Sequence, residues 1–221
     1  MPFRRRRRFV RRPRRRFYRK RRFTPRLRPE VKMENATLAT SFSTVAGSWI
    51  EEDVLAPIVG GTGSIGNRVG RKIAVTGLQI KGVLFGGAVG TGGFDDYYNT
   101  VRLVVLGFRS NKTGAALTPL STTGLGFNSP LVKMSLPGLA HVFRDQMIGI
   151  TNMPYGAGNC APGHRMINIY IRFRKPLVVQ YTTAGADTNQ YQLYISMISD
   201  SAAVPSPGFT QGFYKLTYTD A

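Results

Sequence analysis

Residues 166–175 read MINIYIRFRK, the most regular alternation of apolar and polar side chains in the chain. Successive side chains of a β-strand point to opposite faces, so this spacing predicts a strand with one face on a core. The apolar positions are Ile167, Ile169, Ile171 and Phe173. Arg172 and Arg174 then project away from that core, where they either meet phosphate or a neighbouring chain, or stay solvated on the strand face.

Strand patterns extend to both sides of this segment, and no stretch is convincingly helical. We expect eight strands, with Pro176 turning the chain between two of them: 36–46, 71–85, 100–108, 140–151, 166–175, 177–183, 191–199 and 212–219. Eight antiparallel strands in one domain fit an all-β double-sheet jelly roll better than a seven-stranded immunoglobulin sandwich.

Four segments carry finer predictions. Residues 100–108 are almost continuously apolar, which indicates a strand covered on both faces. The apolar phase of 71–85 shifts by one residue at Thr76 and Gly77, which predicts a β-bulge. Residues 48–59 are ambiguous and could hold a short helical turn. Residues 110–138 form a long irregular connection of the kind that is usually functional, and residues 131–139 are a candidate contact surface.

The first 28 residues form an arginine-rich arm that contains no Asp or Glu. Repulsion between like charges, the scarcity of aliphatic side chains and the prolines predict that it is disordered when free. We therefore divide the chain into a disordered arm and linker, 1–35, and a jelly-roll domain, 36–221. The sixteen cations of the arm are Arg4, Arg5, Arg6, Arg7, Arg8, Arg11, Arg12, Arg14, Arg15, Arg16, Arg19, Lys20, Arg21, Arg22, Arg26 and Arg28.

The side chains of the arm suit nucleic acid. Guanidinium groups bind phosphate bidentately, and the interleaved aromatics, among them Phe9, Phe17 and Tyr18, can stack on unpaired bases. We predict that these cations and aromatics bind nucleic acid. A nuclear-localisation signal is a second interpretation, compatible with the first. An anionic membrane surface is a weaker alternative, because the arm has no amphipathic apolar face.

The charge of the chain is concentrated in this arm. The net charge is +20, from 31 basic and 11 acidic residues, and removing the sixteen arm cations leaves the remaining 193 residues at +4. The single cysteine, Cys160, excludes an intramolecular disulfide and a cysteine-cluster zinc site. We find no secretory signal and no membrane-spanning run, so we expect a soluble, intracellular protein.

No catalytic or metal-binding pattern stands out. Residues 61–66 match G-x-G-x-x-G, but a strand pattern follows where a dinucleotide site needs a helix. His141 with Asp145, and His164 alone, are the histidine candidates for acid–base chemistry, and none has an evident nucleophile. Acidic residues at 51–53 and 95–96 could contribute to a cation site between subunits, although solvated loops are the default. We predict no enzymatic activity, no cofactor and no metal.

A second set of cations lies in the domain rather than in the arm. We consider them possible secondary contacts to nucleic acid: Arg68, Arg71, Lys72, Arg172, Arg174 and Lys175.

The order of several motifs resembles a known family. The arginine-rich start is followed by RVGRKI at 68–73 and LQIKG at 78–82, then IYIRFRKPL at 169–177, LYISMISDS at 193–201 and LTYTD at 216–220. Together these resemble the capsid proteins of circoviruses and circovirus-like agents, which have circular single-stranded DNA genomes and encode a replication protein.

This resemblance implies a jelly-roll subunit, sixty copies of which close into a T=1 icosahedral shell with the arm turned inward on the DNA. It also implies a nuclear-localisation role, and hence host import receptors as partners, with the protein found in the virion and the host nucleus. A host attachment factor is expected but not identified. Sixteen cations on sixty copies give on the order of a thousand charges, which matches a short genome with one charge per nucleotide.

Two other classes of function remain open. A coat protein of a small RNA virus would carry a similar arm, and so would a cellular ribosomal or nucleolar nucleic-acid-binding protein. The mild charge of the domain disfavours the cellular protein. An enzyme acting on nucleic acid is disfavoured by the lack of a catalytic constellation.

Overall fold

A computed structural model describes residues 30–38, 49–61, 67–87, 98–108, 140–155, 159–182, 191–201 and 206–221, with the backbone alone at 140, 154, 155 and 159–161. The predictions for the arm, for the connection 110–138, for the acidic pair 95–96 and for the Cys160 side chain fall outside this description.

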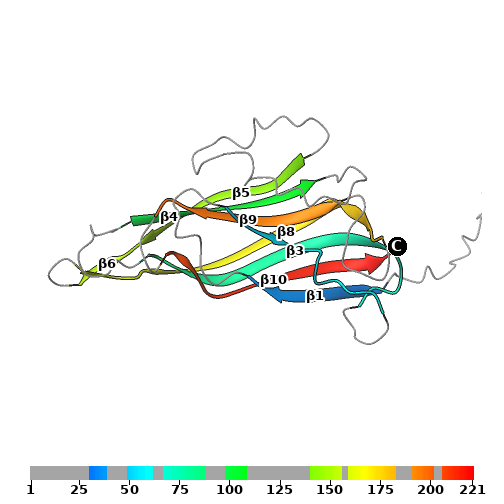
Figure 1. The fold of residues 1–221 in the computed structure, drawn as a ribbon, viewed down its shortest axis with the longest axis horizontal. Coiled ribbons are helices and arrows are strands. Elements are labelled where there is room, and N and C mark those ends of the chain that lie inside the picture. Colours follow the sequence, from blue (N-terminus) through cyan, green and yellow to red (C-terminus); the bar gives the residue numbers. More distant parts are fainter. Residues whose placement is uncertain are drawn as a thin grey trace, which may run out of the picture.

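The described chain is all-β, and its two main sheets are antiparallel and four-stranded (Figure 1). Sheet A has the order β1 (Val31–Thr37), β10 (Gly208–Asp220), β3 (Lys72–Phe85) and β8 (His164–Gln180). Sheet B has the order β2 (Ile50–Asp53), β9 (Gln192–Ser199), β4 (Tyr98–Phe108) and β5 (Ala140–Thr151). Two short strands, β6 (Met153–Tyr155) and β7 (Asn159–Ala161), pair with each other and were not predicted.

The eight strands of the two main sheets pair in a nested pattern. The first pairs with the last, β1 with β10, and the second with the second-last, β2 with β9. Further inward β3 pairs with β8 and β4 with β5. The chain thus behaves as one long antiparallel ribbon folded over itself, which is consistent with the predicted jelly roll.

The core lies between the two sheets. Alternate side chains of β3, β10 and β8 meet those of β4 and β9, with Leu78, Ile195 and Leu216 fully buried. β4 also contributes to a second buried cluster on the opposite face of sheet B, with Trp49, Val104, Leu106, Phe108, Tyr194 and Ile198. The prediction that residues 100–108 are covered on both faces is therefore confirmed.

The predicted β-bulge is also confirmed. The registers of β3 with β10 and with β8 both shift between Val75 and Gly77, so Thr76 has no residue opposite it in the ladder of either neighbouring strand. Its hydroxyl donates instead to the Thr217 carbonyl of β10 at 3.1 Å. The inner-facing residues change phase across it, from Ile73 and Val75 to Leu78 and Ile80.

Two predicted boundaries were wrong. Residues 31–35, expected to be a linker, belong to β1, so the sheet begins five residues before the predicted domain start at 36. Pro176 does not end a strand: Leu177 continues β8 and pairs with Val75, while residues 173–176 bulge opposite Thr76. Proline is tolerated there because β8 is an edge strand and the bulge needs no ladder hydrogen bond. Predicted residues 166–175 and 177–183 therefore belong largely to one strand.

The ambiguous segment 48–59 contains a strand rather than a helix. β2 pairs with β9, and a turn follows in which the Leu55 amide donates to the Asp53 carboxylate at 2.9 Å. No helix in the described residues is long and apolar enough to cross a membrane.

Candidate nucleic-acid interface

The two sheets differ in charge. The strands of sheet A carry eight cations and two acids, Glu34 and Asp220, whereas those of sheet B carry two cations and four acids. The cations of sheet A are Lys32, Lys72, Lys81, Arg165, Arg172, Arg174, Lys175 and Lys215. The net charge is thus +6 for sheet A and −2 for sheet B, so a polyanion is attracted to one side of the sandwich.

The two acids of sheet A do not offset the charge of its outer face, by which we mean the face turned away from the core. Glu34 lies on the inner side of β1 with Lys32 and Ala36, and burial raises its pKa. Asp220 is engaged in an ion pair with Lys32, Nζ to Oδ2 2.7 Å. The outer face is therefore basic over the residues described.

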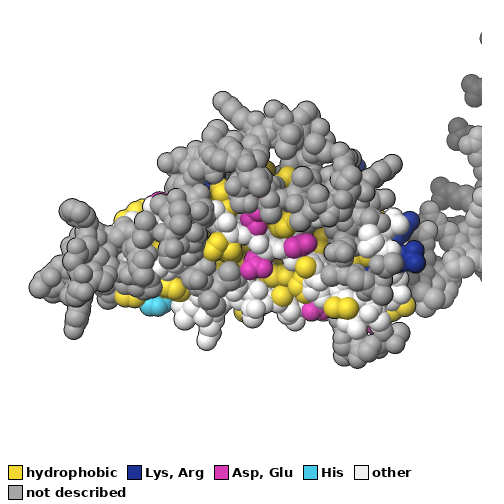
Figure 2. All heavy atoms as spheres, in the orientation of Figure 1, with side chains coloured by type: hydrophobic (Ala, Val, Ile, Leu, Met, Phe, Trp, Pro, Cys, Tyr) yellow, Lys and Arg dark blue, Asp and Glu magenta, His cyan; other side chains and the backbone are white. Residues whose placement is uncertain are grey.

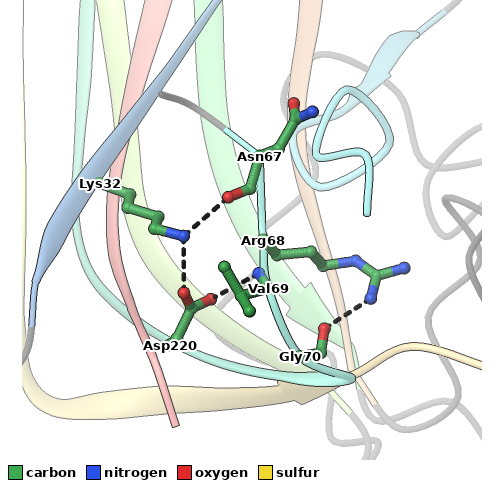
Figure 3. A network of polar contacts seen from close by, with 6 residues as sticks. All are labelled: Lys32, Asn67, Arg68, Val69, Gly70 and Asp220. Atoms are coloured by element: carbon green, nitrogen blue, oxygen red, sulfur yellow. Dashed lines mark hydrogen bonds and ion pairs between the residues drawn. The ribbon is translucent and has the colours of Figure 1, made fainter. Parts of the chain in front are cut away.

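Lys32 and Asp220 fix the place where the arm joins the domain (Figure 3). Lys32 is only 5 % exposed, and its Nζ also donates to the Asn67 carbonyl oxygen at 2.8 Å. The second carboxylate oxygen of Asp220 accepts from the Val69 amide at 3.3 Å. The start of β1, the segment 67–70 and the last strand are thereby tied together, so the arm begins at one defined end of sheet A.

Arg68 does not fit its predicted role. Its side chain is 3 % exposed and its guanidinium lies over the Tyr181 ring, 4.1 Å from the centroid. One nitrogen, Nη1, donates to the Gly70 carbonyl at 2.6 Å, and the Tyr181 hydroxyl donates to the Leu55 carbonyl at 3.2 Å. Arg68 therefore packs inside the domain and cannot reach phosphate outside it. The prediction that Arg68 is a secondary contact to nucleic acid was wrong.

The other five predicted cations of the domain are exposed and lie near the root of the arm. Val31 of β1 is in register with Thr219, Ala74 and Val178 across sheet A. All five lie within six residues of that row along the chain, Arg71 just before β3 and the others on their strands: Lys72, Arg172, Arg174 and Lys175. Figure 2 shows Lys and Arg side chains at the end of the molecule that carries the chain's C-terminus, and acidic side chains nearer the middle.

Further along the outer face, polar and aromatic side chains form cross-strand rows. In one row, Phe213 of β10, Lys81 of β3 and Asn168 of β8 lie opposite one another. In the adjacent row, Lys215 of β10, Gln79 of β3 and Tyr170 of β8 do the same. The Gln79 side-chain amide donates from Nε2 to the side-chain oxygen Oδ1 of Asn168 at 2.9 Å. A shallow groove of about 690 Å³ crosses β1, β10 and β3 here, lined by Asn35, Ala36, Thr37, Gln79, Lys81, Phe213 and Lys215.

The histidine candidates do not form an acid–base pair. Both carboxylate oxygens of Asp145 accept from Arg102, at 2.9 Å from Nε and 2.6 Å from Nη2. His141 instead packs edge-on against Phe143, with ring centroids 4.6 Å apart. His164 is exposed at the start of β8. Within the described ranges no three His, Cys, Asp or Glu side chains group together as a metal site.

Sequence reasoning missed Lys81, Lys215, Gln79, Asn168 and Phe213 as a group. Each occupies an outward position of its strand, and that signal was available from the alternation. That these residues are neighbours could not be predicted, because it depends on the register of three strands that are far apart in the sequence.

Comparison with protein-family models finds no match for this chain, and comparison with curated proteins finds no significant one.

Proposed function

We propose that this chain is a viral coat protein with a jelly-roll domain, whose copies close into a small T=1 shell of sixty subunits and package circular single-stranded DNA through the arginine-rich arm. The same arm serves as a nuclear-localisation signal read by host import receptors. The protein then resides in the virion and, during infection, in the host nucleus.

The observation that carries this proposal is the charge polarity of the sandwich. The strands of sheet A have a net charge of +6 and those of sheet B of −2, and the arm joins the domain at the start of β1, an edge strand of sheet A. A closed shell presents the same face of every copy to its contents. A subunit whose basic sheet includes the strand that follows the arm suits that arrangement.

Exposed apolar side chains at the two edges of sheet A support self-assembly. Val31 and Met33 are exposed on β1, and Met166 and Val178 on β8, with Met166 81 % exposed. Exposed apolar residues and open strand edges favour association with other chains. Contacts between copies would bury these groups.

The test is negative-stain electron microscopy of the recombinant full-length protein, with the ratio of absorbance at 260 and 280 nm measured on the assembled fraction. We expect uniform small spheres that contain nucleic acid. Extracted contents that resist ribonuclease and are degraded by a single-strand-specific deoxyribonuclease would identify DNA. Contents sensitive to ribonuclease would favour an RNA-virus coat protein, and dispersed monomers with nucleic acid present would overturn the proposal.

A further inference from the structure

We propose that the outer face of sheet A is a second nucleic-acid contact, in which Tyr170 and Phe213 stack on unpaired bases of a single strand while Lys81 and Lys215 contact its phosphates. The nature of the ligand rests on the proposed function. The site itself rests on the geometry of the sheet and lies outside the arm.

Tyr170 lies on the sheet as a platform. Its hydroxyl oxygen is 3.0 Å and its Cζ 3.5 Å from the position that a Cβ on Gly77 would occupy, so the ring extends over the glycine. Gly77 thus leaves space that any other residue would fill. The tyrosine remains 62 % exposed, so an aromatic surface faces outward on the basic sheet. Such a surface suits a base, because every base has a π-face.

Phe213 provides a second aromatic surface. It is 42 % exposed in the groove of about 690 Å³, flanked by Lys81 and Lys215. Ligand pockets commonly have volumes of about 300–1,000 Å³, so the groove can accommodate a nucleotide. A large exposed apolar ring is costly in water, and stacking on a base would cover it.

The spacing of the two rings favours a single strand. Phe213 is in register with Lys81 and Asn168, and Tyr170 lies two residues beyond Asn168. Two strand spacings and two residues along a strand separate the two backbone positions by roughly 12 Å. Bases stacked along a duplex strand are about 3.4 Å apart, so the rings would hold two separated, unstacked bases.

The side chains around the two rings also suit the binding of a single nucleic-acid strand. The side-chain amides of Gln79 and Asn168, bonded to each other at 2.9 Å, can exchange hydrogen bonds with base edges. Lys81 and Lys215 have no ion-pair partner among the described residues, and no described carboxylate lines the groove. Because these cations have no carboxylate nearby, they can bind phosphate groups. We expect them to bind the phosphates of a nucleic-acid strand rather than the carboxylates of an acidic protein, whose positions are fixed by its fold.

The experiment uses the full-length protein, freed of nucleic acid at high salt, and a fluorescent oligo-deoxythymidine titrated at several salt concentrations. Phosphate contacts make affinity fall with salt, with a slope of about 0.7 per contact on single strands, whereas stacking changes affinity without changing the slope. High salt therefore suppresses the phosphate contacts of the arm, and comparing each variant with the unaltered protein at the same salt concentration isolates the stacking contribution of the sheet.

We expect Tyr170→Ala and Phe213→Ala each to weaken single-strand binding by roughly 5- to 150-fold at high salt, with an unchanged salt slope. Lys81→Ala with Lys215→Ala should instead lower the slope, by about 1.4. Tyr98→Ala is the matched control. Tyr98 is also an exposed tyrosine that packs over a glycine, Gly149, but it lies on sheet B. Its replacement should leave binding unchanged.

Photocrosslinking with a 5-bromodeoxyuridine oligonucleotide locates the contact directly, and we expect crosslinked peptides that contain Tyr170 or Phe213. Crosslinks confined to the arm, together with unchanged affinity of both alanine variants, would overturn the sheet contact and leave the proposed packaging function intact. Equal losses of single-strand and duplex binding would also overturn it. Failure of the full-length protein to bind any single strand would overturn the proposed function itself.

Discussion

Lys32 is a cation that the fold buries next to the root of the arm. It depends on Asp220 and the Asn67 carbonyl for its hydrogen bonds, at 2.7 and 2.8 Å. Removing one member of a buried ion pair is more harmful than removing both, because the remaining charge is left without its counterion.

We therefore expect Asp220→Ala to lower the free energy of unfolding by about 2–3 kcal/mol. This is below the roughly 3–5 kcal/mol of a fully buried pair, because the Asp220 side chain is 31 % exposed. Urea unfolding of the full-length protein measures the change. Combining Asp220→Ala with Lys32→Met should recover part of the loss.

The control for this prediction is Glu30→Gln, which removes the same charge from an exposed residue two positions before Lys32. We expect a change within about 0.5 kcal/mol, as for ordinary surface substitutions. Equal effects of Asp220→Ala and Glu30→Gln would show that the pair contributes nothing beyond general surface charge.

Four buried tyrosines make stability depend on alkaline pH. Burial raises the pKa of Tyr194 to about 12, and the carboxylates of Asp53 and Glu51 add to the effect. Burial likewise raises the pKa of Tyr218 to about 12, and it raises the pKa values of Tyr181 and Tyr214. In the unfolded chain the pKa of tyrosine is about 10.

Because the folded pKa exceeds the unfolded one, the stabilisation is complete below about pH 10 and is lost as the pH rises toward the folded pKa. We expect the free energy of unfolding to fall from pH 10 to pH 12, as measured by urea unfolding at intervals of half a unit. Tyr194→Phe should make the decline shallower. A flat profile above pH 10 would contradict this account.

At the scale of elements, the start of β1 limits how much of the N-terminal region can be deleted without destabilising sheet A. A deletion of residues 1–28 leaves β1 whole, so we expect the strand-rich circular dichroism spectrum and the unfolding midpoint to persist. A deletion of residues 1–35 removes five of the seven residues of β1, including Lys32, and exposes the edge of β10. That variant should have a lower midpoint and aggregate, because an open strand edge invites pairing between chains.

Equal stability of the two deletion variants would show that β1 contributes little to the sheet. Loss of the β spectrum in the shorter deletion would show that the domain needs the arm to fold. The two outcomes are separable because the variants differ only in residues 29–35.

The strands that could be predicted from the sequence are those whose apolar side chains face the core. In 166–175 the buried residues are the apolar ones, and the phase shift at Thr76 marked the bulge correctly. β1 has the opposite pattern: Val31 and Met33 point outward while Lys32 is buried. Its strand is fixed by pairing with β10, nearly two hundred residues away, which no local pattern reveals.

The residues of the candidate interface could also be predicted only in part. Alternation correctly placed Arg172 and Arg174 on the side opposite Ile171 and Phe173. It could not show that Arg68 is buried, because that depends on Tyr181, more than a hundred residues further along the chain. Local patterns therefore give the direction of a side chain within a strand, and long-range pairing gives its neighbours.

At the scale of the whole molecule, the arm and the outer face of sheet A have different tasks in the proposed shell. The arm carries sixteen of the chain's 31 cations. The strands of sheet A carry eight cations, half as many as the arm, and the outer face also has two exposed aromatic rings, Tyr170 and Phe213. The arm would set how much nucleic acid enters, because neutralisation scales with charge. The sheet face would set which form is preferred, because stacking needs unpaired bases.

This division of tasks predicts the contents of particles assembled from arm variants. Sixty copies without residues 1–28 would lack on the order of a thousand cations, so any particles that form should be nearly empty of nucleic acid. Replacing every arm arginine by lysine keeps the charge but loses the planar fork. Those particles should retain most of their nucleic acid and release it at lower salt. The measurement is the ratio of absorbance at 260 and 280 nm of purified particles across a salt series. Equal nucleic-acid content with and without the arm would refute its packaging role.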